Sequence, residues 1–145
     1  MKAKLLSEAA GQKDFALIFN TGDEVMKLLI DYAREQRLMG CHFTAIGAFE
    51  SAVLGYFDWK VKDYKKIPVR EQVEVLSLIG DIAEKEDGKP QVHAHVVVGT
   101  SDGQALGGHL IEGHVRPTLE LILTQSPIHL RKRHDPESGL ALIRL

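Results

Sequence analysis

Only one segment of this 145-residue sequence has the residue spacing of a long helix, and that limits the folds open to it. Residues 21–24 (TGDE) have the pattern of a capping box, in which Thr21 and Glu24 satisfy each other's backbone amides. Val25, Leu28 and Leu29 follow at helical spacing, and Gly40 predicts the end of the helix. The rest of the chain therefore has to form mostly strands.

The expected strands are short and are separated by turn-forming residues. They cover residues 2–8, 14–20, 41–49, 51–59, 70–79, 91–100, 104–112 and 118–125, with 140–145 as a candidate for closing the sheet. Residues 60–68 and 113–117 are expected to be connections, and the basic run 131–134 (RKRH) a solvated segment. Short turns between strands favour an α+β fold with a mostly antiparallel or mixed sheet. No repeat or linker interrupts the sequence, so residues 1–145 are expected to form a single domain.

Composition excludes several classes of protein. Eighteen Lys and Arg against 20 Asp and Glu give a net charge of -2, which argues against a scaffold dedicated to duplex DNA but leaves a local basic patch open. The single cysteine, Cys41, excludes an internal disulfide and a thiolate-rich zinc module. The apolar run near the N-terminus is too short for a signal peptide or a membrane span, so we expect a soluble, cytoplasmic protein without membrane contact.

Histidine is the residue type whose placement indicates chemistry. In the expected strand 91–100, His93 and His95 share one face, and their Cα atoms are about 6–7 Å apart. If residues 101–103 form a three-residue loop, residues paired across the hairpin have numbers that add to 204, and His109 lies opposite His95. A two-residue turn would send His109 to the other face, unless a bulge at residues 107–108 restored the register.

Three imidazoles on one face are a ligand set for a divalent transition metal, and zinc is the first expectation. Since no cysteine accompanies His93, His95 and His109, an open site completed by water or a small acid fits better than a closed structural one. The alternative interpretation is that the three are ordinary polar residues of a half-buried strand.

A metal site used in catalysis would also need an acid, a base or a substrate-binding cation beside the ion. Register alone cannot place these groups, and surface positions are the more common outcome for such residues. The candidates are Glu50, Glu112 and Glu120 as acid or base, Arg116 for a substrate carboxylate, and His114 as an alternative ligand or a support for one. His42, His129 and His134 are expected at the surface or the edge of the core.

Three motifs in combination resemble a known family. They are residues 73–80 (VEVLSLIG), residues 88–95 (GKPQVHAH) and residues 107–110 (GGHL). The chain resembles the plants and prokaryotes conserved (PPC) domain over essentially its whole length. The resemblance implies a sheet flanked by one main helix and short helices, assembly into a homotrimer, and a metal at His93, His95 and His109.

The sequence also departs from the plant members of that family. The plant domain follows an AT-hook built around Arg-Gly-Arg-Pro, and these 145 residues contain no such segment. Where the plant domain carries Gly-Arg-Phe-Glu-Ile-Leu for contacts with other nuclear factors, this chain has residues 71–76 (EQVEVL). The chain therefore looks like the stand-alone prokaryotic form. A more distant similarity is to acetolactate decarboxylase, a zinc enzyme with a similar three-histidine arrangement.

Three functions follow from these observations. We favour a non-enzymatic metal-binding module that associates with DNA or protein partners. The first alternative is a small-molecule zinc enzyme, hydrolytic or decarboxylating, similar to acetolactate decarboxylase. The second alternative is a trimeric structural protein whose metal only rigidifies the fold. An acidic side chain beside the metal in a deep cleft would favour the enzyme, whereas salt-sensitive retention of DNA would favour the binding module.

Overall fold

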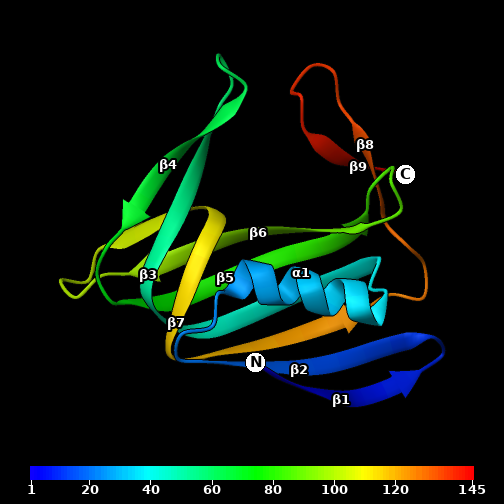
Figure 1. Ribbon diagram of the computed structural model, residues 1–145, viewed down its shortest axis with the longest axis horizontal. Coiled ribbons are helices and arrows are strands. Elements are labelled where there is room, and N and C mark those ends of the chain that lie inside the picture. The colour runs from blue at the N-terminus through cyan, green and yellow to red at the C-terminus, as the bar shows by residue number, and fades with distance from the viewer.

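Strands dominate the computed structural model, which describes residues 1–145. The strands are β1 (Lys2–Ala9), β2 (Gln12–Asn20), β3 (Gly40–Asp58), β4 (Asp63–Val69), β5 (Val73–Glu84), β6 (Pro90–Gly99), β7 (Ala105–Gln125), β8 (Arg131–His134) and β9 (Ala141–Arg144), and the helix α1 spans Val25–Gln36 (Figure 1). All strand pairs are antiparallel except the single parallel contact between β5 and β8. The α+β expectation holds in broad outline. The expected short helices are absent, so that part of the prediction was wrong.

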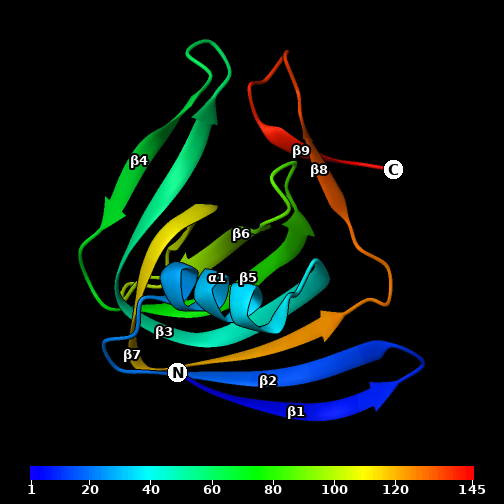
Figure 2. The same ribbon diagram turned by 45° about the vertical axis from the view of Figure 1, so that its right-hand side comes forward.

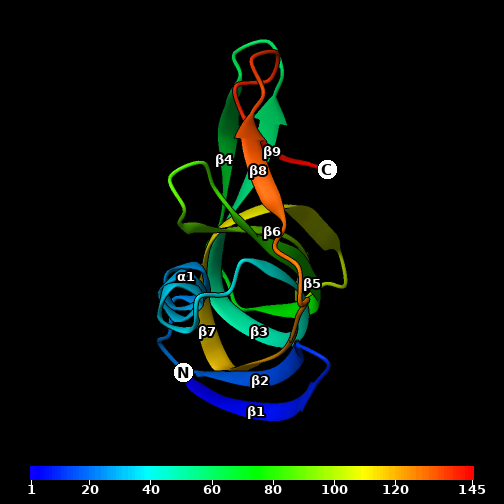
Figure 3. The ribbon, with the colours of Figure 1, turned by 90° about the vertical axis from the view of Figure 1, so that its right-hand side faces the viewer.

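Four strands close on themselves around the core. β3 pairs with β5 and β7, and β6 also pairs with β5 and β7, so these strands form a ring that the view along the sheet shows end-on (Figure 3). The helix lies against β6 and β7 and buries Val25, Leu29 and Ala33 there. A cluster of 27 buried apolar residues fills the interior, with Phe19, Phe43 and Phe49 among its largest side chains.

The helix begins and ends differently from the sequence prediction. Glu24 is the N-cap, and its carboxylate accepts hydrogen bonds from the backbone amides of Met26 and Lys27, so the capping box headed by Thr21 was wrong. The Thr21 hydroxyl instead donates to the backbone carbonyl of Pro117, 96 residues away. At the other end, Arg37 adopts the left-handed conformation (φ 54°) that ends the helix, which leaves Gly40 free to begin β3.

Two pairs of strands that the sequence predicted as separate are continuous in the structure. Residues 113–117 continue through β7, so the expected strands 104–112 and 118–125 form one strand of 21 residues. The expected strands 41–49 and 51–59 likewise merge into the 19-residue β3, which bends at Gly47. Gly47 has φ 152°, and a Cβ there would lie 2.3 Å from the carbonyl oxygen of Thr118. Such a contact is too short for any side chain, so the close approach of β3 to β7 requires glycine.

Two hairpins project from the same side of the ring (Figure 2). The first, here called the β3–β4 arm, comprises residues 56–67, which include most of the segment expected as a polar connection. The second, the β8–β9 arm, comprises residues 131–144. It joins the sheet through the pair Glu84↔Arg131, and β9 pairs only with β8, so β9 extends the sheet at its edge and does not close it.

Candidate metal centre

The candidate metal centre begins with the alternation of β6. Val92, Ala94 and Val96 are buried in the core, so His93 and His95 project from the opposite face. Across the hairpin, His109 on β7 is the register partner of His95. The same pairing continues to Gly99 and Ala105 without a register shift, so the expected alignment is confirmed and no bulge is needed.

The three imidazoles converge on one point. Their ligand atoms all lie within 4.8 Å of one another. The ring centroid of His93 lies 5.0 Å from that of His95 and 5.3 Å from that of His109, and the His95 and His109 centroids are 5.6 Å apart. Zinc holds its nitrogen ligands about 2.0–2.1 Å away, so the three imidazoles are close enough to share one ion after small side-chain rotations.

His93 is held by an acidic residue on the neighbouring strand. Asp81 of β5 is the register partner of His93, and Nδ1 of His93 donates to Oδ2 of Asp81 at 3.2 Å. This bond leaves Nε2 of His93 free to act as a ligand, the arrangement in which a carboxylate orients a metal-binding histidine. The other Asp81 oxygen lies 2.8 Å from Nζ of Lys132 on β8, whose side chain is only 3% exposed.

His109 is held from a different strand. Tyr64 of β4 stacks on its ring, with centroids 4.6 Å apart and planes 28° apart. Nδ1 of His109 is buried and has no hydrogen-bond partner in the protein. A buried, unpaired nitrogen costs free energy, so an arrangement that leaves one beside two other imidazoles fits a bound cation.

The environment favours the neutral form of His95 and His109. Burial, and then the neighbouring His93, His95 and Lys132, lower the pKa of His109 to about 4. Burial and the charge of His93 also lower the pKa of His95. For Asp81, burial alone would raise the pKa, but the hydrogen bond from His93 and the pairing with Lys132 outweigh it, so the pKa is lowered. The site thus combines neutral His95 and His109 with an ionised carboxylate, the protonation states that metal binding needs.

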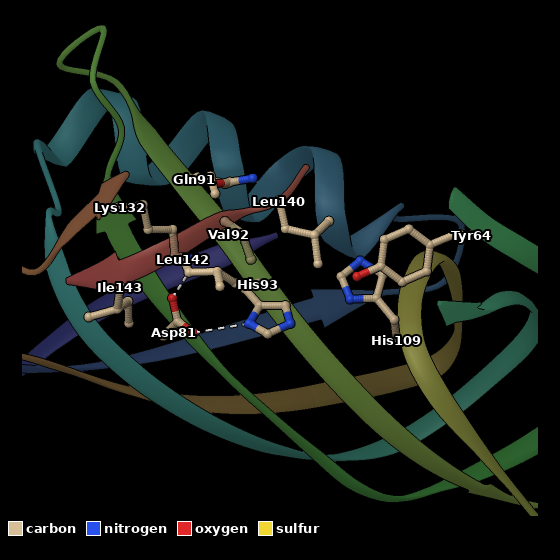
Figure 4. Close-up of a pocket in the computed structure, with 11 residues that line it drawn as sticks. Tyr64, Asp81, Gln91, Val92, His93, His109, Lys132, Leu140, Leu142 and Ile143 are labelled. Atoms are coloured by element: carbon tan, nitrogen blue, oxygen red, sulfur yellow. Dashed lines mark hydrogen bonds and ion pairs between the residues drawn. The ribbon is translucent and has the colours of Figure 1, made fainter. Parts of the chain in front are cut away.

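A cavity of about 320 Å³ lies beside His93 and His109 (Figure 4). Tyr64 and Asp81 form part of its wall, and the β8–β9 arm contributes Lys132 together with residues 140–143. In Figure 4, Leu140 and Leu142 lie over the cavity while His93 and His109 face it from the sheet. The donor set, the unpaired nitrogen and the adjoining space together fit an open site for a divalent transition metal.

The acidic and basic candidates from the sequence lie elsewhere, and none of them lines this cavity. Glu112 and His114 pair with each other at 2.6 Å. Arg116 pairs with Glu50 at 3.8 Å, and Glu120 lines a separate groove beside Ile46 and Ile122. The interpretation of these residues as surface charges is therefore the better one.

Three residues that complete the site were not predicted from the sequence: Tyr64, Asp81 and Lys132. The sequence did contain a signal for Asp81. Asp81 and His93 are equally far in sequence from the centre of the 85–89 turn, so a hairpin at that turn pairs them across β5 and β6. Lys132 belongs to the basic run expected to be solvated, and its burial corrects that expectation. Tyr64 lies in the segment expected to be a connection, so nothing in the sequence indicated its position on β4.

Comparison with known families identifies the class of protein to which this sheet and site belong. The family model of the Plants and Prokaryotes Conserved (PCC) domain, the domain abbreviated PPC above, matches residues 6–127. The chain therefore belongs to that family. The β8–β9 arm lies beyond the matched residues.

Solved structures of three relatives agree over nearly the whole chain. A PPC protein of Pyrococcus horikoshii is 28% identical with a TM-score of 0.84, covering 99% of this chain and 95% of that one. A metal-containing protein of Archaeoglobus fulgidus is 34% identical with a TM-score of 0.82, covering 92% and 94%. A protein of Ralstonia eutropha, described provisionally as DNA-binding, is 32% identical with a TM-score of 0.83, covering 90% of each chain.

Two further similarities are more limited. The bifunctional protein GlmU of a Synechococcus strain is 31% identical over 121 residues, which are 81% of this chain and 18% of that protein. The chain thus spans about a fifth of the length of that curated relative. A Staphylococcus aureus protein similar to α-acetolactate decarboxylase is 11% identical with a TM-score of 0.53, covering 76% of this chain and 50% of that one, a likeness of fold alone. No helix here has the length and hydrophobicity needed to cross a bilayer.

Proposed function

We propose that this protein is a metal-binding PPC-domain module that holds zinc at His93, His95 and His109. The observation that carries the proposal is the convergence of three imidazole ligand atoms within 4.8 Å of one another. Three nitrogen ligands without a thiolate suit zinc and leave a fourth position open. The cavity beside the site has room for a water or a small carboxylic acid at that position. The metal-containing relative from Archaeoglobus fulgidus supports the proposal.

Metal analysis of the purified protein tests this assignment. We expect about one zinc per chain in the wild type and a large loss in His93→Ala, since two ligands hold zinc far less tightly than three. His114→Ala is the matched control, because His114 pairs with Glu112 outside the cavity and should leave the metal content unchanged. Equal metal in the wild type and His93→Ala would contradict the proposal.

The proposed assembly is a homotrimer, as the family resemblance implies. A row of apolar side chains on the outer face of the sheet supports association with other copies, since soluble monomers rarely expose a large contiguous apolar patch. The exposed members are Ile46, Leu76, Ile79, Val97 and Ile122. Light scattering of the wild type should give the mass of three chains, and Ile79→Lys should shift it toward one. A wild-type mass of one chain would contradict the trimer.

The proposed role is association with DNA or regulatory partners, without catalysis. The Ralstonia eutropha relative supports the DNA part of this role. Asp81 also supports a non-catalytic site, because both of its oxygens are engaged by His93 and Lys132 and are not free to take a proton from a metal-bound water. Gel shift of duplex DNA at rising salt is the test, and no retention at low salt would remove this role.

The alternative is a small-molecule zinc enzyme, and the cavity is the observation that favours it. It adjoins two of the three histidines and combines apolar walls with Tyr64 and Lys132. Incubation of the zinc-loaded protein with acetolactate, followed by measurement of released carbon dioxide, separates the two functions. Release above that of His93→Ala would establish the enzyme, whereas equal release would favour the binding module.

A further inference from the structure

The β3–β4 arm carries a cluster of basic residues that the metal site does not use. Four exposed lysines, Lys60, Lys62, Lys65 and Lys66, lie within seven residues of one another at and beside the hairpin tip. Elsewhere in the chain, lysines at four other positions form ion pairs with carboxylates. None of the four arm lysines forms one, so their charges are available to a partner.

The two aspartates of the arm do not neutralise these lysines. Asp58 and Asp63 are register partners at the end of the hairpin, and each accepts a backbone hydrogen bond. Oδ1 of Asp58 accepts from the amide of Lys60 at 2.8 Å, and Oδ1 of Asp63 accepts from the amide of Tyr64 at 2.7 Å. Their role is to shape the turn, and the arm keeps an excess of positive charge although the whole chain has a net charge of -2.

Exposed aromatic and apolar side chains lie between the lysines. Trp59 is 56% exposed, Val61 is 70% exposed and Tyr56 is 64% exposed, although large side chains of this kind are usually buried in the core. Phe57 packs edge-on against both Trp59 and Tyr64, and Tyr64 in turn stacks on His109. Tyr64 thus anchors the arm to the metal site, and the tip is free to contact another molecule.

We infer that the β3–β4 arm is the surface that contacts duplex DNA, by entering a groove as a two-stranded ribbon. The major groove, about 12 Å wide, admits a β-ribbon, and lysines on such a ribbon reach the phosphates on either side. Trp59 and Val61 at the tip then lie against base edges or methyl groups, as apolar residues do in other ribbon and wedge contacts. The inference rests on the proposed association with DNA and names the surface that provides it.

The decisive comparison is between two variants that lose the same charge. In the first, the four arm lysines are changed to Gln; in the second, Lys2, Lys4, Lys27 and Lys89 are changed to Gln, all exposed and outside the arm. Binding of a labelled duplex is followed by fluorescence anisotropy from 50 to 200 mM salt. Four phosphate contacts predict a wild-type affinity that falls roughly 100-fold over this range. The arm variant should lose most of that dependence, and the control variant should keep it.

Trp59 gives an independent measurement, because it is the only tryptophan of the chain. Its fluorescence should change on addition of the duplex in the wild type and in the control variant. Circular dichroism and metal content, unchanged in the arm variant, would show that the fold and the metal site are intact.

The outcomes distinguish this inference from the proposed function. If the wild type binds no DNA at 50 mM salt, both fail. If the arm variant binds DNA as the wild type does, the protein associates with DNA through another surface and only the arm assignment fails. Tighter binding to a single strand than to the duplex, or a Trp59 response to vesicles of anionic lipid with none to DNA, would also overturn it.

Discussion

The β3–β4 and β8–β9 arms project on either side of the same cavity, but their charged residues are used in opposite ways. The β8–β9 arm pairs three of its four Lys and Arg side chains with carboxylates: Arg131 with Glu84 at 3.3 Å, Lys132 with Asp81 at 2.8 Å and Arg144 with Asp135 at 3.1 Å. The lysines of the β3–β4 arm pair with no carboxylate and are exposed. A basic run in the sequence is therefore a poor guide to a binding surface until the pairing of each charge is known.

The largest effect expected from this difference is on stability. Lys132→Met would leave the half-buried Asp81 carboxylate without its cation and should lower the free energy of unfolding by about 2–4 kcal/mol. Lys65→Met in the β3–β4 arm removes an unpaired, exposed charge and should change it by less than about 0.5 kcal/mol. Urea denaturation followed by circular dichroism measures both, and similar values would mean that the Lys132 pair contributes no more than a surface lysine.

The next effect is on metal affinity. Asp81→Asn removes the carboxylate that orients His93, and a change of this kind weakens metal binding by roughly 10- to 100-fold. Asp63→Asn at the tip of the β3–β4 arm is the control and should leave the affinity unchanged. Competition with a chromophoric zinc chelator measures the affinities. An unchanged affinity in Asp81→Asn would exclude the carboxylate as a support of the site.

The dependence of stability on pH should come from the site between the arms. In the metal-free protein the pKa of His109 is lowered from 6.5 to about 4, so between these values the unfolded state binds a proton that the native state does not. The contribution of His109 to the free energy of unfolding is therefore fully present above about pH 6.5, and it is lost as the pH drops toward 4. We expect a loss of about 1–2 kcal/mol after allowance for partial exposure of the ring.

Urea denaturation at pH 7, 6, 5 and 4.5 tests this dependence, with His109→Gln as the variant that should flatten it. The lowered pKa of Asp81 acts in a different window: its contribution is present above about pH 4 and is lost only at lower pH. The prediction would be contradicted if the metal-free wild-type protein became more stable as the pH was lowered from 6.5 to 4.5.

The smallest effect concerns the contact between the β3–β4 arm and the site. Tyr64→Ala removes the ring stacked on His109, an interaction of about 0.5–1.5 kcal/mol, and should weaken zinc binding roughly 2- to 10-fold. Tyr64→Phe keeps the ring and should bind zinc as the wild type does. If Tyr64→Phe loses as much affinity as Tyr64→Ala, the hydroxyl and not the stacking is responsible.

The sequence predicts well where the signal is local. Alternation in β6 placed His93 and His95 on one face, and the loop at residues 101–103 set the register that brings His109 opposite His95. Both follow from interactions between residues close in sequence, since a one-residue slip would turn the valines of β6 out of the core. The long strands β3 and β7 were divided in the sequence analysis because their glycines and Pro117 look like turns until strand pairing is known.

What this sequence determined by itself is the set of three imidazoles, because strand alternation and one short hairpin are enough to align them. The hairpin around residues 85–89 likewise aligns Asp81 with His93. Only the tertiary structure decided the rest of their surroundings. Tyr64 and Lys132 come from β4 and β8, and their approach depends on how the sheet bends and how the arms pack. Such contacts arise from the packing of distant segments, and no spacing within a strand encodes them.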